Sequence, residues 1–290
     1  MIVGAHLRNQ PQLWPEDFTR FKRGKFNGAV ALWEHNPDEV LKLGISPESC
    51  VVRLPDSEYT DWSKGYPRKY IVGWSDYVAD CLRTITRFYA KGFRVFQLDN
   101  EPNLVWKHHG RTEWDWATFM ADVLPPIHAA KPKDALLGLT PMSMPSQSPQ
   151  WINVLYDKKA NGLPLERYFD VAISHCYWQA AGDMNADWAG KEHEWLWRKT
   201  GMPIYIAEAG NSSIQQTNPP SLEEIRRRQE TQYPKYIEAL KAFTYVRGVY
   251  FFILGGTEID WKGFLLTDKI CDAIGSRVGG GGGGKLPQPN

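Results

Sequence analysis

Eight short apolar runs, separated by helical patterns, constrain the fold of this chain more than any other feature of its sequence. None of the runs alternates cleanly between apolar and polar residues, so each is predicted to be a strand buried on both faces, as parallel strands are. The runs are residues 2–7, 28–33, 50–54, 94–98, 135–139, 171–174, 203–207 and 248–253. Eight strand–helix units in about 250 residues predict an α/β fold with a single (β/α)8 TIM barrel.

Helical patterns fill the intervals between these runs. We predict helices over residues 75–91, 115–130, 189–200 and 221–243, with a break at the prolines of the second and a capping box from Ser221 to Glu224 in the last. A doubly wound sheet is the rival architecture. It would need a glycine-rich phosphate turn after the first strand, and the sequence AHLRNQP found there is not one.

The end of the chain differs from the rest. The barrel is expected over residues 1–278, and residues 279–290 open with an unbroken glycine run that predicts a flexible tail. This tail is either a disordered terminus or a linker to a carbohydrate- or wall-binding module missing from this chain. No signal peptide precedes the first strand, which fits either a cytoplasmic protein or an exported one whose leader has been removed.

Composition excludes several classes of partner. The net charge is +1 with no long basic block, so nucleic acid is not expected to bind. No apolar stretch is long enough to cross a membrane. The four cysteines lie far apart and show no zinc-ligand spacing, which predicts free thiols. We expect a monomer.

Polar side chains follow the predicted strands at their carboxyl ends, where a barrel of this type carries its active site. The strand-end candidates are His6, Glu34, Arg53, Asn100, Glu101, His175, Tyr177, Trp178 and Glu208, with Trp261 in the loop after the eighth strand. Two of them, Glu101 and Glu208, close the fourth and seventh strands.

Two carboxylates held in different protonation states are what glycoside hydrolysis requires. One gives a proton to the leaving oxygen, while the other stays ionised to attack the sugar or to activate water. Like charges close together and a nearby arginine can separate the pKa values of such a pair. A single glutamate at a strand end is more often a salt-bridged rim residue. A pair at strands 4 and 7 is harder to explain in that way.

These residues resemble clan A of the glycoside hydrolases, the "4/7" superfamily of retaining TIM-barrel enzymes. The resemblance rests on Asn100-Glu101-Pro102 after strand 4, on Glu208 in the IAEAG segment of strand 7, and on His175-Cys176-Tyr177 at strand 6, and it spans about residues 1–275. It identifies the clan and no single family within it.

The resemblance implies a role for each matching residue. Glu101 would be the general acid/base and Glu208 the nucleophile of a double displacement that needs no metal and no organic cofactor. Asn100 would hydrogen-bond the 2-hydroxyl of the sugar in the −1 subsite. Tyr177 would hydrogen-bond Glu208, and His175 would line the same subsite.

Two features depart from the cellulase and mannanase branch of this clan. In that branch an arginine near the nucleophile usually comes from strand 2, whereas here Arg53 follows the third run. That branch also carries a tryptophan at the end of strand 8. The segment FFILGG has none, so Trp261 would have to reach back from the following loop.

Tryptophan is frequent, with 13 residues, and several stand in polar surroundings: Trp33, Trp62, Trp106, Trp178 and Trp261. Such residues are either core or a surface that stacks against sugar rings. We therefore expect an oligo- or polysaccharide substrate with β linkages, cleaved by an endo-acting enzyme. A bacterial cell-wall glycan is one alternative. A barrel that binds carbohydrate without cleaving it is an alternative of another class.

Overall fold

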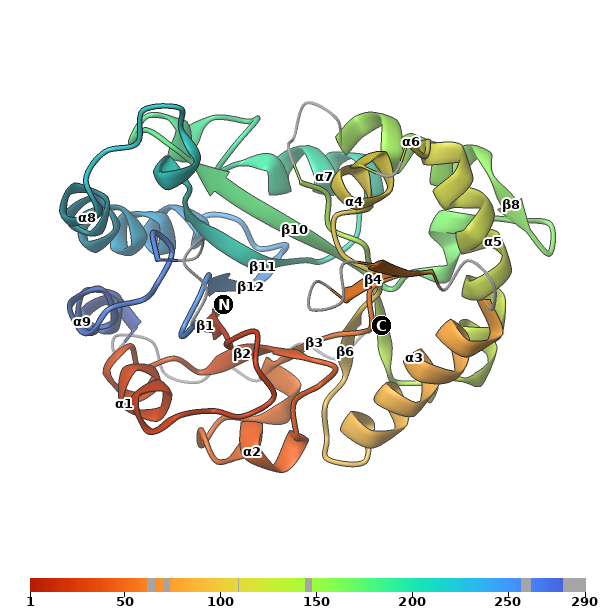
Figure 1. The fold of residues 1–290 in the computed structure, drawn as a ribbon, viewed down its shortest axis with the longest axis horizontal. Coiled ribbons are helices and arrows are strands. Elements are labelled where there is room, and N and C mark those ends of the chain that lie inside the picture. Colours follow the sequence, from red (N-terminus) through yellow and green to blue (C-terminus); the bar gives the residue numbers. More distant parts are fainter. Residues whose placement is uncertain (62–65, 70–73, 109, 144–147, 257–261, 279–290) are drawn as a thin grey trace.

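A computed structural model describes residues 1–61, 66–69, 74–108, 110–143, 148–256 and 262–278, and it shows a closed barrel of eight parallel strands (Figure 1). Around the barrel the strands follow the order β1-β2-β3-β6-β7-β10-β11-β12, and β12 pairs with β1 to close it. The strands are β1 (Ile2–His6), β2 (Gly28–Leu32), β3 (Val51–Arg53), β6 (Val95–Gln97), β7 (Leu136–Leu139), β10 (Val171–Trp178), β11 (Ile204–Asn211) and β12 (Val246–Phe251). All eight predicted strands and the predicted TIM barrel are confirmed.

Helices surround the barrel, as Figure 1 shows. They are α1 (Pro15–Arg23), α2 (Pro37–Leu41), α3 (Trp74–Tyr89), α4 (Pro102–His108), α5 (Glu113–Ala130), α6 (Ser148–Asp157), α7 (Glu192–Thr200), α8 (Leu222–Leu240) and α9 (Asp268–Val278). Short 3₁₀ turns are η1 (Pro47–Ser49), η4 (Leu165–Tyr168), η5 (Asp183–Asn185) and η6 (Ser213–Gln215). The main core lies between these helices and the strands.

The predicted helices are present, with one correction. Ser221 caps α8 by accepting a hydrogen bond from the backbone N–H of Glu224, as its sequence predicted. The predicted proline break in α5 is wrong, because the helix continues through Pro125 and Pro126 to Ala130. Buried side chains on both sides of the prolines, including Leu124 and Ile127, hold this segment against the core although the prolines cannot donate helical hydrogen bonds.

The inside of the barrel is filled at its amino-terminal end. Apolar side chains from seven of the strands form a separate cluster there, and Tyr250 spans it to donate a hydrogen bond to the carbonyl of Ser49. Gly4 leaves room for that ring, since a Cβ at this position would lie 2.4 Å from both the Tyr250 ring and the Gly28 carbonyl. With this end closed, polar inward-facing side chains are left to the carboxyl end.

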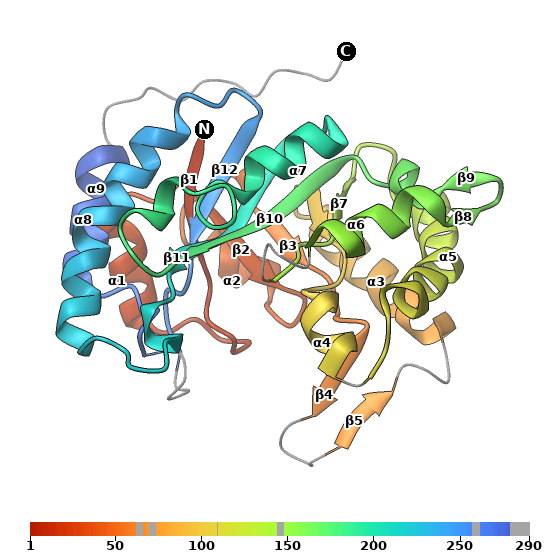
Figure 2. The same cartoon turned by 90° about the horizontal axis from the view of Figure 1, so that it is seen from above.

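Two antiparallel hairpins extend the barrel. One is β4 (Glu58–Asp61) with β5 (Tyr66–Lys69), which follows β3 and projects from the body near α4 in Figure 2. The other pairs β8 (Lys159–Ala160) with β9 (Leu163–Pro164). All four cysteines are free and buried, as predicted. Among the described residues, no helix is both long and apolar enough to cross a membrane. Residues 279–290 and Trp261 lie outside the described residues.

Candidate active site

Side-chain alternation along β10 decides which of its residues face the barrel interior. β10 continues past the predicted end at Ser174 as far as Trp178, so His175 and Tyr177 point inward along with Val171 and Ile173. The same alternation turns Trp178 outward, where its Nε1–H donates to Gln232 Oε1 at 2.8 Å and only 1% of its surface is exposed. The structure therefore does not bring Trp178 to the site. The prediction missed this because it ended the strand too early.

A β-bulge directs Glu208 into the barrel. In the register of β10 against β11, Ser174 pairs with Ile206 but His175 pairs with Glu208, so one extra residue, Ala207, is inserted. An extra residue shifts the alternation of the strand and re-aims the side chains that follow it. Glu208 consequently faces inward from the middle of β11, which continues to Asn211.

Glu101 reaches the same place from a loop. β6 ends at Gln97, and four residues later Glu101 adopts a left-handed conformation with φ of 44°. Asp99 is also left-handed, with φ of 57°. Such values are uncommon for residues other than glycine. The backbone N–H of Glu101 donates to the carbonyl of Pro141, after β7, at 3.1 Å, and this bond fixes the loop against the neighbouring strand end.

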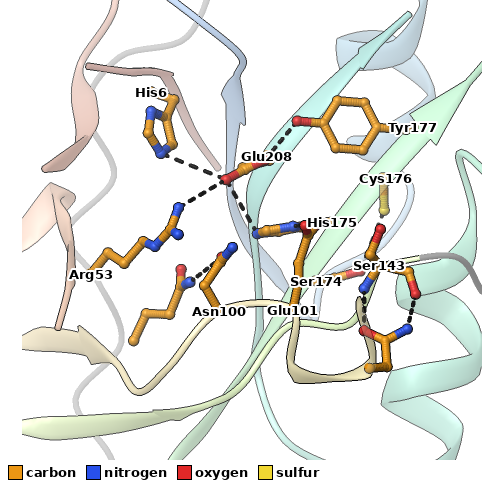
Figure 3. A network of polar contacts seen from close by, with 12 residues as sticks. His6, Arg53, Asn100, Glu101, Ser143, Ser174, His175, Cys176, Tyr177 and Glu208 are labelled. Carbon is orange, nitrogen blue, oxygen red and sulfur yellow. Dashed lines mark hydrogen bonds and ion pairs between the residues drawn. The ribbon is translucent and has the colours of Figure 1, made fainter. Parts of the chain in front are cut away.

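His175 connects the two carboxylates (Figure 3). Its Nδ1 lies 2.7 Å from Glu101 Oε1, and its Nε2 lies 3.6 Å from Glu208 Oε1. One carboxylate oxygen of Glu101 and one of Glu208 lie within 4.8 Å of each other. The side chains of Glu101 and Glu208 are 18% and 8% exposed, so each is largely sheltered from water but still accessible.

Glu208 is surrounded by groups from three strands, β1, β3 and β10. Tyr177 Oη donates a hydrogen bond to Oε2 at 2.6 Å. The other oxygen, Oε1, has Arg53 Nη1 at 3.6 Å and His6 Nε2 at 3.7 Å. Arg53 is fixed in turn by two hydrogen bonds to Asp56, at 3.2 and 3.1 Å. Arg53 does lie on the third strand, so the predicted strand numbering is correct.

Burial and charge give these groups different protonation. Burial lowers the pKa of His6 to about 4 in spite of Glu208, and its Nδ1–H donates to the carbonyl of Leu7 at 2.7 Å. Burial also opposes a charge on His175, but Glu208 and Glu101 together raise its pKa above the usual value. Burial, reinforced by Glu208, raises the pKa of Tyr177 well above its usual value, so this hydroxyl remains a donor.

Asn100 is oriented by a residue that the sequence analysis missed. Gln97 is buried, and its Nε2 donates to Asn100 Oδ1 at 3.2 Å and to the carbonyl of Asp99 at 3.2 Å. Its oxygen is held in this way, and within the described part of the chain no group accepts from its amide N–H groups, so these are available as donors. The signal in the sequence was a polar residue two positions after Val95, on the inward face of an otherwise apolar strand.

The remaining candidates differ in where they lie. Glu34 follows β2 half-buried, and burial, together with Asp56, raises its pKa. Strand β12 brings no tryptophan to the site. Phe252 follows the last residue of β12, and the centroid of its ring lies 5.0 Å from that of His6 and 6.3 Å from that of Tyr177. Trp106 is buried like Trp178, so two of the tryptophans considered as sugar platforms belong to the core.

A cation could also be held by part of this centre. Glu101, His175 and Glu208 each offer one ligand atom, and all three atoms lie within 4.8 Å of one another. Two carboxylates and an imidazole suit several divalent metals. The site therefore allows acid–base chemistry without a metal as well as chemistry that uses a bound metal, and a chelator distinguishes the two.

No protein-family model and no curated protein matches the sequence. Solved structures do match its fold. A family GH128 (subgroup I) endo-β-1,3-glucanase from Amycolatopsis mediterranei, in complex with laminaritriose, has a TM-score of 0.58 at 15% identity, over 94% of this chain and 98% of that one. A β-glucuronidase from Bacteroides uniformis has a TM-score of 0.59 at 14% identity, over 88% of this chain and 30% of that one. At these identities the likeness establishes the barrel fold shared with glycoside hydrolases.

Proposed function

We propose that this protein is a retaining glycoside hydrolase that cleaves a β-linked glycan from within the chain. The observation that carries the proposal is the convergence of Glu101 and Glu208 on either side of His175, at the carboxyl end of the barrel, with an oxygen of each within 4.8 Å. Retaining glycosidases hold their two carboxyl groups about 5–5.5 Å apart, whereas inverting enzymes need about 6.5–9.5 Å to admit a water molecule. The separation in this site favours retention.

The proposed reaction assigns a different task to each carboxylate. Glu208 Oε1, which accepts no hydrogen bond among the described residues, attacks the anomeric carbon, while Glu101 gives its proton to the departing oxygen. The bond to the leaving group breaks and a glycosyl-enzyme ester forms. Glu101 then removes a proton from water, which attacks the same carbon and releases Glu208.

The surrounding groups support these tasks. Tyr177 holds the second oxygen of Glu208, and Arg53 stabilises its negative charge before attack. His175 contacts the oxygen of Glu101 and can share the proton that Glu101 gives and takes back. Asn100 presents amide donors beside Glu101, suited to a sugar hydroxyl.

A β-1,3-glucan is the first substrate to test. The Amycolatopsis glucanase binds laminaritriose, and variants of it with one of two glutamates replaced were crystallised with laminari-oligosaccharides. The fold of that protein matches this chain over nearly its whole length. A bacterial wall glycan remains an alternative substrate.

The proposal is tested with a panel of β-glucans, mannan, xylan and peptidoglycan, using the native chain and Glu101→Gln, Glu208→Gln and Glu223→Gln. The last replaces an exposed glutamate in the first turn of α8 and serves as the matched control. We expect hydrolysis of at least one β-glycan, lost in the first two variants and kept in the third, with the β-anomer appearing first by proton NMR. EDTA is expected to leave the rate unchanged.

Three results would contradict this assignment. An α-anomer as first product would contradict the double displacement. Loss of activity with EDTA, restored by a divalent metal, would favour the metal chemistry that the same three side chains allow. Binding of a glycan without turnover, unchanged in both glutamine variants, would favour a carbohydrate-binding barrel.

A further inference from the structure

Asp99 is a buried carboxylate two residues before Glu101, and the proposed reaction does not use it. Its surface is 2% exposed, and its backbone is left-handed like that of Glu101. Backbone conformations of this kind cost about 1–3 kcal/mol each and persist only where surrounding interactions hold them. We therefore asked which contacts hold this loop.

The carboxylate of Asp99 accepts four hydrogen bonds. The backbone N–H groups of Ser57 and Asn100 each donate to Oδ1 at 2.9 Å. The Ser57 hydroxyl donates to Oδ2 at 2.6 Å, and Trp116 Nε1–H donates to the same oxygen at 3.0 Å. Ser57 Oγ in turn accepts a hydrogen bond from Trp106 Nε1–H at 2.9 Å.

These bonds tie three segments to the Glu101 loop. Ser57 lies at the base of the β4–β5 hairpin, Trp106 belongs to α4 and Trp116 to α5. On its other side the loop is bonded to the end of β7, where Thr140 Oγ1 donates to the carbonyl of Leu98 at 2.7 Å and the backbone N–H of Ser143 donates to Asn103 Oδ1 at 2.9 Å. Asp99 supplies the carboxyl group on the β3 side of this arrangement, and burial, together with Asp56, raises its pKa to about 6.

We propose that Asp99 is a positioning residue for Glu101, which it holds at the departing oxygen by fixing the Asn100 backbone to Ser57 and Trp116. Two backbone amides and an indole N–H can only donate, so the carboxylate accepts from all of them together. An asparagine in its place offers only one acceptor oxygen to these four donors. This inference rests on the proposed function, because it assumes that Glu101 is the general acid/base.

Leaving-group dependence separates positioning of the acid from general support of the fold. A phenyl glycoside needs a proton on its departing oxygen, while a 2,4-dinitrophenyl glycoside hardly does. The value of kcat/KM reports the step that forms the glycosyl-enzyme. A misplaced general acid therefore lowers kcat/KM for the phenyl substrate and spares the dinitrophenyl one, whereas a less stable fold lowers both equally.

The experiment measures kcat/KM of Asp99→Asn on phenyl and 2,4-dinitrophenyl β-laminaribioside, or on the same pair built on whichever sugar the panel identifies. We expect a loss of about 10- to 100-fold on the phenyl substrate, below the roughly 10²–10⁴-fold that a general acid contributes, and less than about 3-fold on the other. Ser57→Ala, which keeps the backbone donor, should show the same pattern more weakly. It also replaces Asp99→Asn if that variant does not fold.

Asp170→Asn is the matched control, because the carboxylate of Asp170 also accepts a hydrogen bond from a backbone N–H, that of Leu137 at 2.8 Å. Asp170 lies at the amino-terminal end of β10, away from the site. This variant is expected to affect both substrates equally. Equal losses on both substrates for Asp99→Asn and for Ser57→Ala would overturn the inference and leave Asp99 a structural residue. Failure of the proposed function looks different, since Glu101→Gln itself would then show no leaving-group dependence.

Discussion

Strands β6 and β11 deliver their glutamates in contrasting ways. Glu208 lies inside an eight-residue strand whose neighbours β10 and β12 pair with it on both sides. Glu101 lies four residues beyond a three-residue strand, in a left-handed loop. The position of Glu208 is thus set by the backbone ladder and one bulge. The position of Glu101 is set by one backbone bond to the carbonyl of Pro141 and by side chains that bond to its loop. Changes near the two glutamates should therefore have different consequences.

The largest expected effect comes from Glu208→Gln. Without a nucleophile the glycosyl-enzyme cannot form, so we expect a loss of kcat on the order of 10⁴–10⁶-fold for every substrate, whatever its leaving group. Steady-state kinetics on phenyl and dinitrophenyl glycosides measure this. A variant that still cleaves the dinitrophenyl substrate well would show that Glu208 is not the attacking group.

Glu101→Gln is expected to cost less, about 10²–10⁴-fold in kcat/KM on substrates that need a proton. Leaving-group dependence sharpens the comparison, because a 2,4-dinitrophenyl glycoside hardly needs a proton and its kcat/KM should be nearly spared. Steady-state kinetics on phenyl and dinitrophenyl glycosides measure this, and equal losses on both substrates would assign the acid to another residue.

Tyr177→Phe tests how far Glu208 depends on its own hydrogen bond. A hydrogen bond to a charged group contributes about 1.5–3 kcal/mol, so we expect a loss of about 10- to 100-fold in kcat/KM that is similar for good and poor leaving groups. Tyr156→Phe, which removes a bond to the carbonyl of Lys199 at the surface, is the control and should retain full activity. A loss confined to substrates with poor leaving groups would mean that Tyr177 supports the general acid and not Glu208.

The last prediction concerns stability. Burial lowers the pKa of His6 and His35 to about 4 and that of His193 to about 3. An unfolded histidine takes up its proton near pH 6.5. Below that pH the unfolded chain binds more protons, so the free energy of unfolding should fall as pH drops from about 6.5 towards 4, by up to about 1.4 kcal/mol per pH unit for each histidine.

His193 allows the pH dependence of stability to be measured without changing the site. It lies outside the site and packs against Phe243 and Tyr245. Urea unfolding of His193→Gln between pH 4 and 7 should show a shallower pH dependence than that of the native chain, while kcat at pH 7 is unchanged. An identical slope in both proteins would mean that His193 is not kept neutral by burial. The pKa of His175 is raised instead, so its contribution to stability is lost as pH rises.

Much of the barrel could be predicted because strands buried on both faces are continuous apolar runs. The residues at which the strands end could not be predicted. The runs at β10 and β11 become polar at His175 and Glu208, but both strands continue, because these side chains face the interior of the barrel, where His175 Nε2 lies 3.6 Å from Glu208 Oε1. The misplacement of Trp178 followed directly from this, since only a continuing strand turns it outward.

The pair of glutamates could be predicted from strand ends alone, whereas the residues that orient them could not. The contacts of Ser57 and Trp116 with Asp99 span 42 and 17 positions of sequence, and no periodicity signals such a contact. The bulge at Ala207 is equally hidden, because it is a property of the pairing between β10 and β11. The β4–β5 hairpin was not anticipated either.

The configuration of azide products tests the central claim most directly. With Glu101→Ala and a dinitrophenyl β-glycoside, azide should attack the glycosyl-enzyme from the side of the missing acid/base and give a β-glycosyl azide. With Glu208→Ala, azide should enter in place of the nucleophile and give the α-glycosyl azide from an activated β-glycoside. Proton NMR determines the anomeric configuration of both azide products. The reverse assignment, or the same configuration from both variants, would contradict the division of tasks between Glu101 and Glu208.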